Sequence, residues 1–204
     1  SLKLWDIHCI IICMKNKYKI CISGAAGGEC FEAAKGLAYD VGREVARQGA
    51  VLVTGATTGI PHQAARGARD AGGMVIGFSP AATIKEHVKK YRLPTDSIEV
   101  IVFTGFGYAG RNLLLTRSSD AVILVCGRIG TLNEFTIAFE DKKIIGILAS
   151  SGGMSDELPH ILRVAKRGAK NIIFDPDPHT LIKKVLAALA KNYEDDGIRG
   201  KRKK

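Results

Sequence analysis

The organisation of the chain is clearest in residues 110–134, which read GRNLLLTRSSDAVILVCGRIGTLNE. A helical pattern up to Ser119 leads into a short apolar run, Ala121 to Cys126, and a glycine-containing loop then leads into a second helical pattern. Short strands that are apolar throughout are typical of a parallel sheet with helices on both of its faces. These residues therefore predict one repeat of an α/β fold.

The same alternation of strands and helices continues along almost the whole chain. We predict strands over residues 18–23, 51–54, 74–78, 98–103, 121–126, 143–149 and 171–174, and helices over residues 30–48, 61–71, 83–91, 109–119, 130–141, 156–167 and 179–193. The pattern indicates a three-layer α/β fold with a central parallel sheet of about seven strands. We expect a single domain over residues 14–193, with residues 1–13 as an extension outside the core and residues 194–204 as a charged, disordered tail.

Composition excludes several classes of protein. The chain has 204 residues, of which 46% are hydrophobic, and this excludes an intrinsically disordered protein. Its longest apolar run is far short of the ~20 residues that a membrane helix needs, and the first residues do not have the order of a signal peptide. We therefore expect a soluble, cytoplasmic protein with no membrane partner. The five cysteines form no C-x-x-C pair, so we also expect free thiols.

The net charge of +10 is concentrated at the C-terminus. Half of it is supplied by Arg199, Lys201, Arg202, Lys203 and Lys204. A basic surplus is typical of proteins that bind nucleic acid, but a terminal run of this kind is more often a solvated tail. We therefore expect a small nucleotide, rather than nucleic acid, as the partner.

Small residues follow several of the predicted strands, at the edge where parallel sheets bind ligands. Gly24 follows the first strand, residues 55–59 (GATTG) follow the second, and residues 127–131 (GRIGT) follow the fifth. Glycine lets the backbone approach a ligand closely, and the N-terminus of the next helix attracts anions. We predict a nucleotide-binding cleft whose phosphate-binding residues are Gly24, Gly55, Thr57, Thr58, Gly59, Gly127, Arg128, Gly130 and Thr131. The alternative is that these glycines only form tight turns.

Other kinds of ligand site are not expected. Residues 105–110 read G-x-G-x-x-G, but they follow the fourth predicted strand, whereas the dinucleotide fingerprint follows the first. A P-loop sequence is absent, and the histidines lack metal-ligand spacing. We therefore expect no NAD or FAD, no metal and no resident cofactor.

One cation and one carboxylate lie near the starts of two predicted helices. Arg111 opens the helix of residues 109–119, and Glu134 lies on the first turn of the helix that follows the fifth strand. Thr131 and Glu134 also have the spacing of a capping box, in which both residues would serve only the helix N-terminus. The functional hypothesis instead places the Arg111 guanidinium and the Glu134 carboxylate together at the cleft.

Residues 127–134 resemble the motif P-G-G-x-G-T-x-x-E of the LOG (Lonely-guy) family, formerly labelled lysine decarboxylases. Arg111 lies 23 residues before Glu134, a spacing that matches the family's upstream arginine. The resemblance covers residues 18–190 and is closer to the branch that is also similar to molybdenum-cofactor carrier proteins and to the Rossmann-like domain of DNA-processing protein A. It implies a Rossmann-like nucleotide-binding domain that forms a homodimer or a higher homo-oligomer.

The resemblance also implies an activity. LOG enzymes hydrolyse the N-glycosidic bond of a nucleoside 5′-monophosphate, such as AMP, to the free base and ribose 5-phosphate. Carried over by position, Arg111 and Glu134 would form the catalytic pair, and Arg117 would support it. The 5′-phosphate would be bound by Gly127, Gly130 and Thr131.

Three departures from the family's pattern leave alternatives open. Cys126 replaces the family's proline, Arg128 replaces its second glycine, and residues 55–59 replace a run of three glycines. A bulky cation at residue 128 prevents the same close backbone approach, although it can bind phosphate through two N–H groups. The second hypothesis is therefore a non-catalytic binder or carrier of a phosphorylated cofactor such as molybdenum cofactor. The third hypothesis is a DNA-binding module.

Overall fold

A parallel sheet of seven strands runs through the centre of the molecule, in a computed structural model that describes residues 17–195. The strands are β1 (Lys19–Gly24), β2 (Val51–Thr54), β3 (Val75–Ser79), β4 (Val100–Phe103), β5 (Ala121–Val125), β6 (Ile144–Leu148) and β7 (Ile172–Asp175). Their order in the sheet is β4-β3-β2-β1-β5-β6-β7. The predicted α/β fold is confirmed, and every strand lies within two residues of its predicted bounds. The expectations for residues 1–13 and 196–204 fall outside the described residues.

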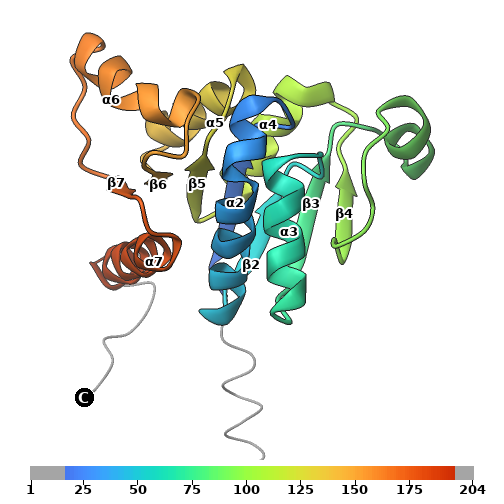
Figure 1. Ribbon diagram of the computed structural model, residues 1–204, viewed down its shortest axis with the longest axis horizontal. Coiled ribbons are helices and arrows are strands. Elements are labelled where there is room, and N and C mark those ends of the chain that lie inside the picture. The colour runs from blue at the N-terminus through green and yellow to red at the C-terminus, as the bar shows by residue number, and fades with distance from the viewer. Residues whose placement is uncertain (1–16, 196–204) are drawn as a thin grey trace, which may run out of the picture.

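Helices cover both faces of the sheet (Figure 1). One face carries α2 (Glu29–Arg47), α3 (Ile60–Asp70) and α7 (Pro178–Asp195), and the other carries α4 (Gly107–Ser118), α5 (Ile129–Glu140) and α6 (Met154–Val164). Six of the seven predicted helices are found, and α7 continues two residues past its predicted end. The helix predicted for residues 83–91 is instead a short π-helix, η1 (Glu86–Lys90).

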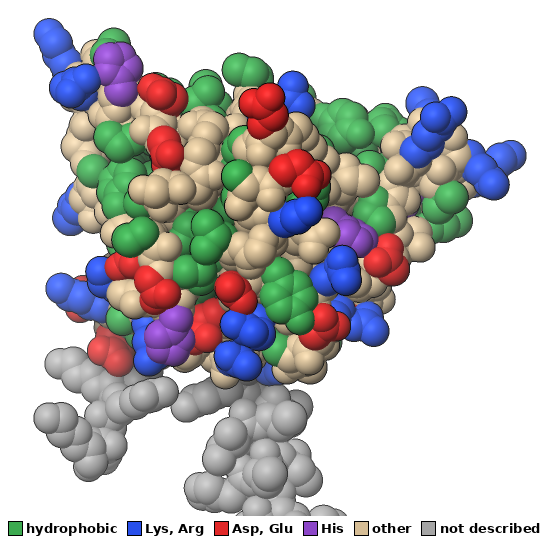
Figure 2. Space-filling model, viewed as in Figure 1, with side chains coloured by type: hydrophobic (Ala, Val, Ile, Leu, Met, Phe, Trp, Pro, Cys, Tyr) green, Lys and Arg blue, Asp and Glu red, His purple; other side chains and the backbone are tan. Residues whose placement is uncertain are grey.

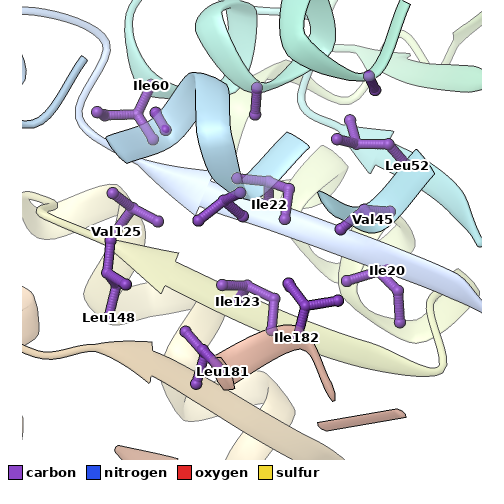
Figure 3. Close-up of a cluster of buried hydrophobic side chains, with 14 of the residues drawn as sticks. Ile20, Ile22, Val45, Leu52, Ile60, Ile123, Val125, Leu148, Leu181 and Ile182 are labelled. Carbon is purple, nitrogen blue, oxygen red and sulfur yellow. The ribbon is translucent and has the colours of Figure 1, made fainter. Parts of the chain in front are cut away.

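The core lies between the central strands and the helices. Ile20 and Ile22 of β1 and Ile123 of β5 are fully buried beneath α2 and α7, as Figure 3 shows. Burying a side chain of this size contributes roughly 1.5 to 3 kcal/mol to the stability of the fold. Continuous apolar strands are therefore favourable at the centre of the sheet, where both faces are covered.

Strand β4 at the edge of the sheet departs from the expectation of two covered faces. Val100 and Val102 are 50% and 40% exposed. In the β3–β4 register Val102 pairs with Phe78, which packs in the cluster under α4, α5 and α6. The exposed valines therefore lie on that same face of the sheet, beyond the helices that cover its centre.

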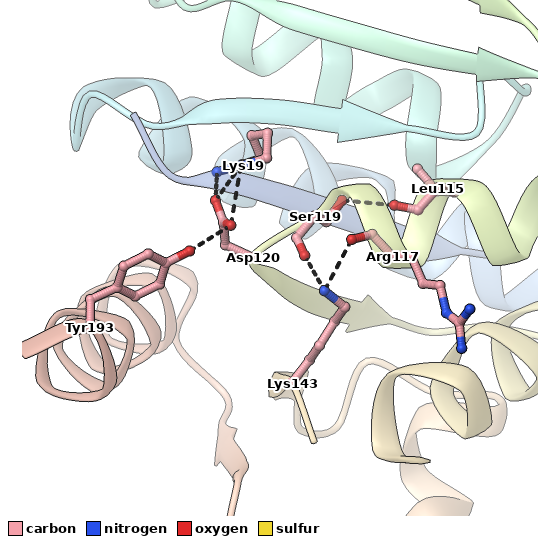
Figure 4. Close-up of polar contacts among 7 residues, drawn as sticks. All are labelled: Lys19, Leu115, Arg117, Ser119, Asp120, Lys143 and Tyr193. Carbon is pink, nitrogen blue, oxygen red and sulfur yellow. Dashed lines mark hydrogen bonds and ion pairs between the residues drawn. The ribbon is translucent and has the colours of Figure 1, made fainter. Parts of the chain in front are cut away.

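The amino edge of the sheet is tied together by polar groups (Figure 4). Asp120 accepts hydrogen bonds from the backbone N–H of Lys19 at 2.7 Å and from the Tyr193 hydroxyl at 2.8 Å. The Lys143 ammonium donates to the carbonyl oxygens of Arg117 and Ser119, where α4 ends. These bonds join β1, β5 and α7 and give Asp120 a structural role at the edge opposite to the predicted cleft.

The expectation of free thiols is wrong for two of the cysteines. Cys30 on the first turn of α2 and Cys126 at the end of β5 form a disulfide, although they are 96 residues apart in sequence. Cys21 is free and buried in the core, and burial raises the pKa of its thiol. Cys9 and Cys13 fall outside the described residues. The disulfide joins the first turn of α2, which follows the loop after β1, to the residue that follows β5, so it ties together the ends of two predicted ligand loops.

The face formed by α2 and α3 has no patch of side chains with a single sign of charge. Acidic and basic side chains alternate there (Figure 2), and several pair within one turn of α2. Asp40 and Arg43 lie 2.7 Å apart, and Glu32 and Lys35 lie 2.9 Å apart. No helix within residues 17–195 is long and apolar enough to cross a membrane.

Candidate functional site

A pocket of about 360 Å³ lies at the carboxyl edge of the sheet. Its walls are the loops after β1 and β2 and the first turns of α4 and α5. Strands β2 to β4 extend to one side of β1 and strands β5 to β7 to the other, so the pocket lies where the chain reverses direction across the sheet. Open parallel sheets bind their ligands at such a switch point.

The structure brings most of the predicted site residues to this pocket. Those that line it are Gly24, Gly55, Thr57, Arg111, Arg128, Gly130, Thr131 and Glu134. Thr58, Gly59 and Gly127 do not line the pocket. Thr58 is exposed and donates to the Ala26 carbonyl at 3.0 Å, and Gly59 packs against the same loop. Arg117 is not brought to the pocket, because its guanidinium pairs with Asp141 at 3.0 Å near the far end of α4.

Arg111 and Glu134 form a buried ion pair inside the pocket. Arg111 Nη1 lies 3.4 Å from Glu134 Oε1, and the two side chains are only 6% and 9% exposed. The other carboxylate oxygen, Oε2, accepts a hydrogen bond from the hydroxyl of Ser23 at the end of β1. Elements that are distant in sequence, α4, α5 and β1, therefore place these three side chains in contact.

Burial disfavours the charged form of both Glu134 and Arg111. It raises the pKa of the Glu134 carboxyl above its ordinary range, against the opposite influence of Arg111 and of the Ser23 hydroxyl. Burial also lowers the pKa of the Arg111 guanidinium, although Glu134 acts to raise it. The Nε of Arg111 is buried and has no hydrogen-bond partner among the described residues. Charged groups held in this way, at a cost in desolvation, cluster at functional sites.

Gly55 makes room for the Arg111 side chain. A Cβ atom added at Gly55 would overlap the Arg111 guanidinium, including Nη1. A side chain at residue 55 would therefore push Arg111 away from Glu134. Gly55, which the sequence predicted as a phosphate-binding residue, therefore has a steric role beside the arginine.

The capping-box interpretation of Thr131 and Glu134 is wrong. Helix α5 begins at Ile129, so Thr131 lies inside the helix and the N-cap residue is Arg128, which makes no side-chain capping hydrogen bond. The Glu134 carboxylate binds Ser23 and Arg111 instead. The first N–H groups of α5 consequently have no side-chain cap, and they face a pocket that Gly130 and Thr131 line.

The backbone before α5 has an unusual conformation. Cys126 and Gly127 both have positive φ, 56° and 120°. A Cβ atom at residue 127 would lie within 2.7 to 2.9 Å of Thr131, so glycine is needed there. The Cys126 N–H donates to the Ser151 hydroxyl at 2.7 Å, and the Gly127 carbonyl accepts from the N–H of Met154 at 3.0 Å. The loop between β6 and α6 thus holds this turn in place from behind.

Several pocket residues were missed at the level of sequence. They are Ile22, Ser23, Ala25, Ala26, Pro61, Tyr108, Asn112 and Ile129. Ser23 had a detectable signal, because it ends a predicted strand beside Gly24 at the edge where ligands bind. Tyr108 lies three residues before Arg111 on α4, and this spacing places both on one side of the helix.

The fold and this pocket together define a Rossmann-like protein with a candidate ligand pocket at the switch point of its sheet. More specifically, the chain belongs to the SLOG cluster4 family, whose sequence model matches residues 17–182. An uncharacterized protein of Archaeoglobus fulgidus is 36% identical over 121 residues, which is 59% of this chain and 74% of that protein.

Two solved structures show how widely this architecture is shared. The molybdenum-cofactor carrier protein of Chlamydomonas reinhardtii is 26% identical, with a TM-score of 0.72 over 86% of this chain and 99% of the carrier. DNA-processing protein A of Helicobacter pylori, described as binding single-stranded DNA, is 20% identical, with a TM-score of 0.61 over 84% of this chain and 81% of that protein. At that identity the second likeness concerns the fold alone.

Proposed function

We propose that this protein binds a purine nucleoside 5′-monophosphate such as AMP and hydrolyses its N-glycosidic bond. The observation that carries the proposal is the Arg111–Glu134 pair, buried at the floor of a pocket at the switch point of the sheet. A buried carboxylate with an arginine partner is costly for folding alone, and it suits a reaction in which positive charge develops on the substrate.

The phosphate would bind at the first turn of α5. The N–H groups of this turn lack a side-chain cap, Thr131 lines the same wall, and the exposed Arg128 side chain adds a cation. A helix N-terminus favours anions through its dipole and its free N–H groups.

The chemistry requires one water molecule and one carboxylate. The bond from C1′ of the ribose to the base nitrogen breaks, and the base leaves with the electron pair and takes a proton from solvent. The Glu134 carboxylate stabilises the positive charge that develops at C1′ and accepts a proton from the water that attacks there. Arg111 orients the carboxylate and favours its ionised form, which burial alone disfavours.

Release of free base from AMP tests this proposal. We expect the wild-type protein to release adenine and ribose 5-phosphate, and we expect Glu134→Gln to reduce the rate by at least about a hundredfold, as for loss of an acid–base group. Glu157→Gln, an exposed acid on α6, is the matched control and should keep the wild-type rate. Absence of base release at high protein concentration, or an unchanged rate for Glu134→Gln, contradicts the catalytic role.

A second candidate function is carriage of a phosphorylated cofactor such as molybdenum cofactor. Arg128 favours it, because the cation lines the pocket wall at the start of α5. A phosphorylated pterin has an anionic end and a flat heterocyclic end, and the pocket offers both Arg128 and the Tyr108 ring. The carrier function predicts that the pterin is retained through gel filtration without conversion and that Arg128→Ala releases it. Hydrolysis of AMP with no retention of pterin would favour the first function.

We also propose that two copies of the chain associate through the uncovered part of the sheet. Val100 and Val102 are exposed on the face that carries α4, and Leu113 and Leu114 of α4 are 39% and 37% exposed. Exposed apolar side chains that gather on one face are typical of an interaction site. A second copy would cover the same residues through a two-fold axis, which is the commonest symmetry of homo-oligomers.

A further inference from the structure

An exposed aromatic ring stands at the mouth of the pocket. Tyr108 on the first turn of α4 lines the pocket and is 49% exposed, and Ile129 at the start of α5 lines it too and is 74% exposed. The charged pair Arg111 and Glu134 lies deeper and is almost fully buried. The pocket therefore has a charged floor and an apolar, partly aromatic mouth.

Neighbouring side chains hold the Tyr108 ring. The ring of Tyr91, next to η1, meets it edge-on at a centroid distance of 5.6 Å and an angle of 85°. The guanidinium carbon of Arg111 lies 5.8 Å from the centroid of the Tyr108 ring. Aromatic pairs prefer this edge-to-face arrangement, and a cation near a ring face is attracted to it. An aromatic side chain that is already positioned loses little freedom when a ligand packs against it.

We propose that Tyr108 is the stacking platform for the heterocyclic base of the ligand. The inference rests on the proposed binding of a nucleoside monophosphate and adds to it the place of the base. A ribose held with C1′ beside Glu134 carries its base on the same carbon, and Tyr108 lies one helical turn from Arg111 on the same side of α4. The pocket would therefore take ligands with an extended aromatic ring system and a single anionic end, and it would prefer a purine to the smaller pyrimidine.

Two ligands separate the contribution of the base from that of the sugar phosphate. One is formycin 5′-monophosphate, a purine nucleotide analogue whose carbon–carbon glycosidic bond cannot be hydrolysed, and the other is ribose 5-phosphate, which has no base. Binding of each is measured by calorimetry to the wild-type protein and to Tyr108→Ala and Tyr108→Phe. Tyr39→Ala, which changes a tyrosine of α2 outside the pocket lining, is the control.

If Tyr108 stacks on the base, its removal should reduce the affinity only for the ligand that has a base. Tyr108→Ala should weaken binding of formycin 5′-monophosphate by about 5- to 150-fold, the range that loss of one stacked aromatic produces. The affinity for ribose 5-phosphate should stay unchanged in this variant, and Tyr108→Phe and Tyr39→Ala should bind both ligands as the wild type does. Unchanged affinity for the nucleotide in Tyr108→Ala, or an equal loss for both ligands, would overturn the role of Tyr108.

The outcomes also distinguish this inference from the proposed activity. If formycin 5′-monophosphate binds and depends on Tyr108 but AMP is not hydrolysed, the stacking site stands and the catalytic proposal fails. If AMP is hydrolysed with no dependence of nucleotide affinity on Tyr108, the activity stands and the stacking site fails. If the wild-type protein binds neither ligand, both are wrong.

Discussion

The Nη1 atom of Arg111 lies 3.4 Å from Oε1 of Glu134, and both side chains are more than nine-tenths buried. Two charges removed from water in this way are costly, and their attraction offsets only part of the cost. Removing one partner leaves the other charge buried without compensation. The pair should therefore behave as a unit in measurements of stability.

A double-mutant cycle tests this coupling. We expect Arg111→Met and Glu134→Gln each to lower the free energy of unfolding by about 3 to 5 kcal/mol, because each leaves one buried charge unpaired. The double variant has no such charge and should lose much less than the sum of the two single losses. Urea unfolding of the four proteins measures the cycle. Additive losses would show that the two groups do not interact.

The Ser23 hydroxyl should lower the pKa of the Glu134 carboxyl relative to a protein that lacks this hydroxyl. It donates to Glu134 Oε2 and thereby opposes the rise in the carboxyl pKa that burial causes. Ser23→Ala removes that hydrogen bond, so the pKa of Glu134 should rise further and the ionised fraction at a given pH should fall. Titration of the ¹³C-labelled glutamate carboxyl by NMR, assigned with Glu134→Gln, measures this shift without requiring turnover.

A second serine provides the control for this titration. Ser119 is also buried and donates to the Leu115 carbonyl at 2.9 Å, but it lies at the amino edge of the sheet. Ser119→Ala should leave the Glu134 titration at its wild-type position. A Ser23→Ala protein with an unchanged or lower Glu134 pKa would contradict the assigned hydrogen bond. Since the proposed reaction needs the carboxylate, activity should be lost as the pH falls through a pKa above the ordinary range.

Two glycine substitutions should have opposite effects on stability. Gly55→Ala adds a methyl group where the Arg111 guanidinium lies, so we expect a loss of about 1 to 3 kcal/mol from overpacking together with weaker nucleotide binding. Gly36 lies exposed within α2, and a methyl group added there would meet open space, so Gly36→Ala should gain about 0.5 to 1 kcal/mol. Thermal unfolding and calorimetric titration measure both variants. A Gly55→Ala protein with wild-type binding would contradict the steric role of residue 55.

The fold was predictable because its signals are local. The central strands, such as Ala121–Val125, are short and wholly apolar, and each is followed by a helix with its own pattern. The π-helix Glu86–Lys90 was not predictable, because its form accompanies a tertiary contact. His87 is fully buried there, hydrogen-bonded to Ser79 at 2.8 Å and to the Pro94 carbonyl at 2.9 Å.

The candidate site was predictable only where a motif linked its parts. The resemblance of residues 127–134 to a known motif joined Glu134 to Arg111, whereas nothing in the local sequence indicates that Ser23 reaches the same carboxylate. Arg117 could have been set aside, because six residues along a helix of about 3.6 residues per turn lead to a different face from that of Arg111. The Cys30–Cys126 disulfide could not be predicted from the sequence, because cysteines 96 residues apart meet only through the tertiary fold.

The exposed valines of β4 predict the oligomeric state. Val102→Lys places a charge on the face proposed to meet a second copy, so this variant should be a monomer under conditions in which the wild-type protein is a dimer. Val164→Lys is the control, because Val164 on α6 is 66% exposed but lies at the opposite end of the sheet. Light scattering after gel filtration measures the mass. A monomeric wild-type protein, or a dimeric Val102→Lys variant, would contradict the proposed interface.

The disulfide should stabilise the ligand loops and the fold. It joins Cys30 of α2 to Cys126, the residue before Gly127, and closes a loop of 96 residues in the unfolded chain. The chain-entropy model gives about 4 to 5 kcal/mol for a loop of this length. Reductant should therefore lower the free energy of unfolding of the wild-type protein by an amount of this order.

The Cys30→Ser variant has no disulfide at this position. It should therefore start from the lower free energy of unfolding, and reductant should lower that value no further. Alkylation of the unfolded, unreduced protein followed by peptide mapping provides the direct check, because Cys21 should be labelled while Cys30 and Cys126 are protected. Labelling of Cys30 and Cys126 under these conditions would refute the bond, and the first turn of α2 and the end of β5 would then be held together by packing alone.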